Sequence, residues 1–144
     1  MADLGLRQID DAVHTFNTWI NEIARDMDGD KLQAYHALRA GLFALRDRMM
    51  PDEALDLSQQ LPVVVRGVFF EGWQPKDTPV IDRTRDAWLA TLEGHLRQEN
   101  ADGVDPEEAA TATMALLKRH LTPGAMKHLS SNLPEDVTKM LDAA

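Results

Sequence analysis

Apolar residues near the start of the chain recur at alternating intervals of four and three positions. The series after Leu6 is Ile9, Val13, Phe16, Ile20, Ile23 and Met27. On a helix with about 3.6 residues per turn, this spacing places the whole series in one stripe. Gly29 follows the series, and glycine is the usual residue at a helix end. The pattern therefore predicts an amphipathic helix over about 6–27 that ends in Asp28-Gly29-Asp30.

Apolar spacing and helix-start signals predict seven further helices. Proline suits the first turn of a helix, and a capping Asp satisfies backbone N–H groups there. The expected starts lie near Asp30, Pro51, Pro62, Ile81, Asp105, Pro123 and Pro134. The segment 63–70, Val-Val-Val-Arg-Gly-Val-Phe-Phe, has a composition typical of a strand. We still expect a helix there, because no second strand exists with which its backbone could pair. The predicted fold class is all-α.

The sequence also matches itself when it is shifted by about 72 residues. Leu57-Ser58-x-x-Leu61-Pro62 falls on Leu129-Ser130-x-x-Leu133-Pro134, and Pro51 falls on Pro123. We therefore expect two tandem pseudo-repeats of about four helices each, residues 1–72 and 73–144, with a linker at about 71–80. Because a lobe of about 72 residues has a marginal core, the two lobes should pack together as one bundle-like domain.

Composition excludes several classes of function. The chain has 144 residues, with 15 Lys and Arg against 24 Asp and Glu and a formal net charge of −9. Nucleic-acid binding is not expected, because contact with phosphates needs a basic face. The absence of cysteine excludes disulfides and thiolate chemistry. No apolar run approaches the ~18–20 residues of a transmembrane helix, and no signal-peptide pattern is visible. We expect an acidic cytoplasmic protein without membrane insertion.

No arrangement of polar residues along the sequence predicts a catalytic or metal site. The histidines include no pair four positions apart, and His120 and His128 lie on different predicted helices. The segment that starts at Asp26 resembles a calcium loop, but Lys31 and Ala37 stand where such a loop needs glycine and glutamate. No serine shows the strained turn and paired base of a nucleophile. We expect no catalytic residue, no metal ligand and no cofactor, and we predict that the protein is not an enzyme.

The candidate binding residues surround the segment from Arg66 to Trp73, which the second repeat does not reproduce. Phe70 and Trp73 would floor a groove between the lobes. Arg66 and Arg39 would offer charged donors to a carboxylate or phosphate, with Glu71 beside them. The structural alternative is that Trp73 fills the joint between the lobes and that Arg66 pairs with a neighbouring carboxylate.

Several motifs resemble a known bacterial family. They are Ala34-Tyr35-His36-Ala37-Leu38-Arg39-Ala40, Leu45-Arg46-Asp47-Arg48, Gln60-Leu61-Pro62, Arg66-Gly67 and Gly72-Trp73-x-Pro75, with Pro123 and Leu133-Pro134 in the second half. In this order they resemble the family called domain of unknown function 2267 over nearly the whole chain. The resemblance implies a small all-helical cytoplasmic protein, and it brings no established reaction, ligand or catalytic residue.

Two hypotheses of function follow. The first is a non-catalytic helical module that binds an unknown protein partner or forms a homo-oligomer, because the chain combines helices, a repeat and no catalytic set. The alternative is a small-ligand binder or unrecognised enzyme that uses a groove around Arg66 and Trp73. The alternative requires a concave apolar pocket with Arg66 inside it.

Overall fold

The computed structural model describes residues 5–144. Within this range the protein consists of helices joined by loops and contains no strand, so the all-α prediction is confirmed. The α-helices are α1 (Arg7–Met27), α2 (Lys31–Asp47), α3 (Pro51–Ser58), α4 (Val63–Phe70), α5 (Arg85–Gln98), α6 (Pro106–His120), α7 (Pro123–Ser131) and α8 (Glu135–Ala143). A short 3-10 helix, η1 (Pro75–Asp77), lies between α4 and α5. The strand-like segment 63–70 is helical, as predicted.

Side-chain caps begin several of these helices. The Asp30 carboxylate accepts a hydrogen bond from the backbone N–H of Gln33 at 2.8 Å, and the Gln33 side chain accepts one from the Asp30 N–H at 2.9 Å. Asp105 caps α6 by accepting from the N–H of Glu108 at 2.9 Å. These bonds satisfy N–H groups that have no partner within their own helix, which explains why short-range sequence signals locate the helix starts.

The first helix ends where predicted, although by a different residue, and the start of the fifth helix differs from the prediction. α1 ends with Asp28, not Gly29, in the left-handed conformation, with φ at 51°. The short polar side chain of Asp tolerates this conformation, so glycine is not needed there. The fifth helix begins at Arg85 instead of Ile81, because the Thr84 side chain caps it. Ile81 consequently lies outside the helix and is 89% exposed.

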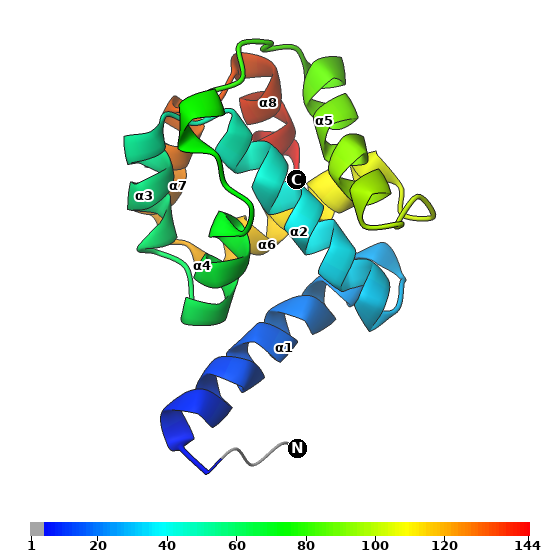
Figure 1. The fold of residues 1–144 in the computed structure, drawn as a ribbon, viewed down its shortest axis with the longest axis vertical. Coiled ribbons are helices and arrows are strands. Elements are labelled where there is room, and N and C mark those ends of the chain that lie inside the picture. The colour runs from blue at the N-terminus through cyan, green and yellow to red at the C-terminus, as the bar shows by residue number, and fades with distance from the viewer. Residues whose placement is uncertain (1–4) are drawn as a thin grey trace.

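α2 lies at the centre of the molecule and packs against α1, α4, α5 and α6 (Figure 1). Its crossing with α6 is unusually close. A Cβ atom on Gly41 would lie 2.3 Å from the Oγ1 atom of Thr113 on α6. The same hydroxyl lies 3.4 Å from the carbonyl oxygen of Ala37, to which it donates. Glycine at position 41 therefore sets the separation of the two central helices.

One hydrophobic core extends through both halves of the chain. It includes the fully buried side chains of Leu38 and Leu42 on α2, Trp88 and Leu92 on α5, and Leu117 on α6. The indole N–H of Trp88 donates to the carbonyl oxygen of Ala44 at 3.0 Å, which leaves this buried polar group satisfied. In the part of the chain that the structure describes, none of the helices combines the length and apolar character needed to cross a bilayer.

Candidate functional site

The first half of α1 carries an apolar face that the described residues leave largely uncovered. Leu6, Ile9 and Val13 are 52%, 43% and 43% exposed. They belong to the same stripe as Ile20 and Ile23, which are buried. Figure 1 shows the first turns of α1 extending away from the other helices. The apolar stripe thus continues beyond the point at which the protein's own core covers it.

The second half of α1 is held firmly against α6. Trp19 stacks on His120, with ring centroids 4.5 Å apart. The Glu22 carboxylate accepts hydrogen bonds from Arg119 at 2.8 Å and from His120 at 2.7 Å. Burial by itself would raise the pKa of Glu22, but these two partners lower it below its ordinary value. The anchored second half fixes the direction in which the first half projects.

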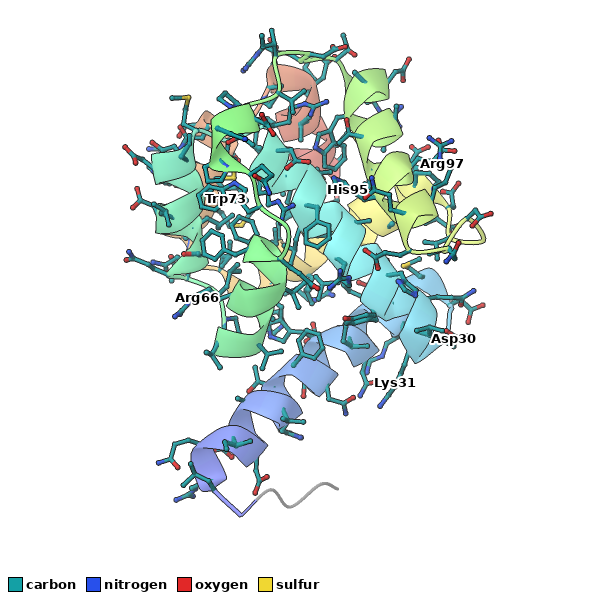
Figure 2. The ribbon with its side chains drawn as sticks, in the orientation of Figure 1. Asp30, Lys31, Arg66, Trp73, His95 and Arg97 are labelled. Carbon is teal, nitrogen blue, oxygen red and sulfur yellow. The ribbon has the colours of Figure 1, made fainter. Side chains whose placement is uncertain are left out.

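A groove of about 550 Å³ lies where α1 meets the start of α2. Its apolar lining is formed by Val13, Phe16, Ile20, Leu32 and Tyr35. Leu32 is 64% exposed, and Phe16 meets Tyr35 edge-on with ring centroids 6.3 Å apart. The Lys31 ammonium donates to the Asn17 side chain at 2.8 Å and ties α2 to α1 beside the groove (Figure 2). The groove and the uncovered face form one continuous apolar region, which we call the α1 surface.

The structure brings four of the five predicted binding residues into one neighbourhood. Arg39 forms an ion pair with Glu71, and the rings of Phe70 and Trp73 lie 5.0 Å apart. Trp73 is half-buried and packs against the core. These residues lie where α4 ends beside α2.

Arg66, on the same helix as Phe70, makes contacts of its own. Its Nε donates to the carbonyl oxygen of Ser58 at 2.9 Å and its Nη2 to that of Leu61 at 3.0 Å. Figure 2 shows Arg66 on the outer side of α4, whereas Trp73 follows the end of that helix. Arg66 therefore holds the end of α3, and backbone carbonyls take the place of the carboxylate that the sequence suggested.

Arg39 is the centre of a polar network between helices. Its Nε donates to Glu99, at the end of α5, at 3.0 Å, and Nδ1 of His36 lies 2.6 Å from the same carboxylate oxygen. Burial alone would lower the pKa of Arg39, but Glu71 and Glu99 raise it above its ordinary value. The guanidinium is thus neutralised within the protein. Five depressions on the surface of residues 5–144 are lined by residues other than the five predicted ones.

A second cluster of polar side chains joins α3 and α7. The Nε2 atom of His128 lies 2.6 Å from Oε2 of Glu53 and 3.9 Å from Oδ2 of Asp56. One ligand atom from each of the three residues lies within 4.8 Å of the others, so together they could hold a metal ion. Nothing in the order of residues along the chain predicts this cluster. The spacing of Glu53 and Asp56 places both on one face of a helix, but only the contact between α3 and α7 supplies the histidine.

Comparison with known proteins identifies a family but no activity. A family model with the description "Uncharacterized conserved protein (DUF2267)" matches residues 16–140. This range includes all the motifs on which the resemblance rests, while the first turns of α1 precede it. No curated protein matches the chain.

Proposed function

The chain belongs to the DUF2267 family, whose description states no activity, and we propose that it is a non-catalytic module that associates with a second copy of itself through the α1 surface. The observation that carries this proposal is the uncovered apolar stripe on the first half of α1. Leu6, Ile9 and Val13 are each roughly half exposed. Covering apolar area contributes about 25 cal/mol per Å², so a partner that covers this stripe gains free energy. A large exposed apolar surface is typical of an interaction site.

A second copy suits the α1 surface because this surface offers both a ridge and a groove. Leu6, Ile9 and Val13 form the ridge, and the groove beside it is open at Leu32 and Tyr35. A two-fold axis near Val13 would place the ridge of each copy in the groove of the other, which is the self-complementary arrangement of a symmetric dimer. The part of α1 from residue 7 to residue 20 spans about 20 Å at ~1.5 Å per residue, enough for an antiparallel helix pair.

The polar face of α1 argues against a lipid surface as the occupant. Helices that lie on anionic membranes carry Lys and Arg on that face. The charged residues of α1 are instead Arg7, Asp10, Asp11, Glu22, Arg25 and Asp26, and the whole chain carries −9. An anionic bilayer would repel this surface, whereas a protein partner can cover it.

Sedimentation equilibrium of the full chain tests the proposal. We expect a reversible dimer with a dissociation constant in the micromolar range, because the ridge consists of three partly exposed side chains, whereas a standard interface uses about 20–30 residues on each side. The double variant Ile9→Asp/Val13→Asp should be monomeric at concentrations at which the wild-type chain is dimeric. Its circular dichroism should match that of the wild type, and its melting temperature should match at a dilution where the wild type is also monomeric, since neither side chain is buried.

The control is Ile81→Asp, which places a similar charge on another apolar residue, 89% exposed and outside the α1 surface. This variant should dimerise like the wild type. A wild-type chain that remains monomeric at a concentration of about 1 mM, or a double variant that still dimerises, contradicts the proposal.

The alternative of a ligand groove around Arg66 and Trp73 has less support. The Nε and Nη2 atoms of Arg66 already donate to backbone carbonyls, which leaves this guanidinium poorly placed to hold an anion. Trp73 packs against the core and does not line these five depressions.

We also infer that the two halves are tandem repeats within one domain. α3 begins at Pro51 and α7 at Pro123, and α4 begins at Val63 and α8 at Glu135, so both pairs are offset by about 72 residues. Because the core extends through both halves, unfolding followed by tryptophan fluorescence and by circular dichroism should give coincident transitions. Two separate transitions would contradict a single domain.

A repeated side-chain contact supports the same inference. In the first half, Arg66 on α4 donates to the carbonyl oxygen of Ser58 at 2.9 Å. In the second half, Thr138 on α8 donates to the carbonyl oxygen of Ser130 at 3.0 Å. The offset of about 72 residues relates both the donors and the acceptors, although the donor residues differ.

A further inference from the structure

We infer that Glu53, Asp56 and His128 form a binding site for one divalent transition-metal ion, and that Zn²⁺ is the ion that suits it best. α3 supplies the two carboxylates and α7 supplies the imidazole, and these helices contact each other directly. The site is separate from the α1 surface and does not depend on self-association.

The surroundings of the other histidines single out this cluster. In the described range, three other histidines also pair with a carboxylate, and in each case an arginine forms an ion pair with the same carboxylate. The three groups are His36, Glu99 and Arg39; His95, Asp47 and Arg46; and His120, Glu22 and Arg119. In those pairs the guanidinium neutralises the carboxylate and occupies its oxygens.

The cluster at His128 has no such cation. Within residues 5–144, no Lys or Arg lies within ion-pair distance of Glu53 or Asp56, and His128 is the basic residue that contacts both. With a neutral imidazole, the two carboxylates carry a formal charge of about −2. A divalent cation matches this charge.

The distances fit coordination after a small adjustment. Zinc lies about 2.0–2.2 Å from nitrogen and oxygen ligands, so neighbouring ligand atoms lie roughly 3–3.5 Å apart. Nε2 of His128 lies 2.6 Å from Glu53 and 3.9 Å from Asp56, on either side of this range. The side chains of His128 and Asp56 are 52% and 61% exposed, so they can move by less than an ångström without disturbing the core.

A neighbouring amide already orients one ligand. The Nδ2 atom of Asn132 donates to Oε2 of Glu53 at 2.9 Å and to the carbonyl oxygen of His128 at 2.8 Å. Hydrogen bonds of this kind fix the direction of a metal ligand and raise metal affinity. Asn132 is therefore a positioning residue for the carboxylate of Glu53.

The ligand set selects among metal ions. Ca²⁺ and Mg²⁺ prefer sites made only of oxygen atoms, and Ca²⁺ needs six or more of them. One imidazole nitrogen with two carboxylate oxygens suits Zn²⁺, which also accepts three protein ligands and an open fourth position. Asp56 and His128 border a depression of about 300 Å³ whose other walls include Leu57 and Leu129. The fourth position can therefore hold water or a small external ligand.

Isothermal titration calorimetry tests the inference. Zn²⁺ is added to the metal-stripped full chain, which carries no histidine tag. We expect one ion per chain, with Mg²⁺ and Ca²⁺ binding at least tenfold more weakly. His128→Gln should lower the Zn²⁺ affinity by more than about tenfold, and Asn132→Ala should lower it by about tenfold. Zn²⁺ should also raise the melting temperature of the wild type but not that of His128→Gln, because the ion links α3 to α7.

The matched control is His120→Gln, which removes a histidine from the carboxylate of Glu22, where Arg119 remains bound. Zn²⁺ affinity should not change in this variant. Glu53→Gln provides a second test at the site if His128→Gln unfolds. The inference is overturned if the wild type binds no Zn²⁺, or if variants at the site bind it as the wild type does.

Discussion

At the scale of single residues, two arginines at the end of α2 have opposite surroundings. Arg46 donates to the carbonyl oxygens of Phe69 at 2.8 Å and Glu71 at 2.6 Å. Arg48 is 3% exposed, and its Nε and Nη1 have no partner in the described part of the chain. Burial lowers the pKa of both arginines, and Asp47 opposes this effect on each. One arginine thus satisfies backbone carbonyls, whereas the other retains unpaired buried donors.

Replacing each arginine with methionine should change the stability of the protein by different amounts. Arg46→Met should lower the free energy of unfolding by about 2–4 kcal/mol, because it leaves buried carbonyl oxygens without a donor. Arg48→Met should change it by less than about 1 kcal/mol or increase it, because it removes an incompletely paired buried charge. Urea denaturation checks both values. Equal losses of unfolding free energy in the two variants would show that the backbone partners of Arg46 do not make it more stabilising than Arg48.

At the scale of secondary-structure elements, the close crossing of α2 and α6 depends on one glycine. A Cβ at Gly41 would meet Thr113 at 2.3 Å, well inside any normal contact. Well-packed cores tolerate added volume poorly, because neighbouring side chains cannot move without leaving their rotamers. The separation of the two central helices is therefore matched to the absence of a side chain at position 41.

Gly41→Ala should lower the free energy of unfolding by about 1–3 kcal/mol, since the two helices must move apart. Gly94→Ala on α5 is the matched control, because nothing lies within 4 Å of a Cβ at that position. The control should raise stability by up to about 1 kcal/mol through the better helix propensity of alanine. Thermal and urea unfolding measure both. Equal stability of the two variants would contradict a clash at the crossing.

At the scale of the whole molecule, two opposing forces act on the proposed dimer. The α1 surface favours association because it is apolar. The net charge of −9 opposes association, because two copies of like charge repel each other. Salt screens repulsion between exposed charges and leaves apolar burial largely intact.

The dimer should therefore become tighter as salt is added. Raising the NaCl concentration from about 0.05 M to about 0.5 M should lower its dissociation constant severalfold, because the Debye length falls well below ~10 Å. Sedimentation equilibrium at each salt concentration measures this change. A dimer that weakens with added salt would instead be held together by ion pairs, and the role assigned to the apolar stripe would be wrong.

The sequence predicted the helices well because the signals for a helix are local. A cap acts through residues two or three positions away, as Asp30 and Asp105 do. The two differences at helix ends have local causes as well. Asp28 adopts a conformation that usually favours glycine, and Thr84 starts a helix after the apolar Ile81. The sequence predicts that Arg39 and Glu71 belong to one site, but it does not predict the ion pair between them.

The helical class, the family and the apolar stripe from Ile9 to Met27 follow from the order of amino acids alone, because each depends on residue types at fixed spacing. The packing of the helices settles which part of that stripe the described residues leave uncovered, and which partners Arg39 and Arg66 have. It also brought His128 to Glu53, across about 75 positions of the chain. Contacts between helices follow from the packing of many side chains at once, and no short-range spacing records them.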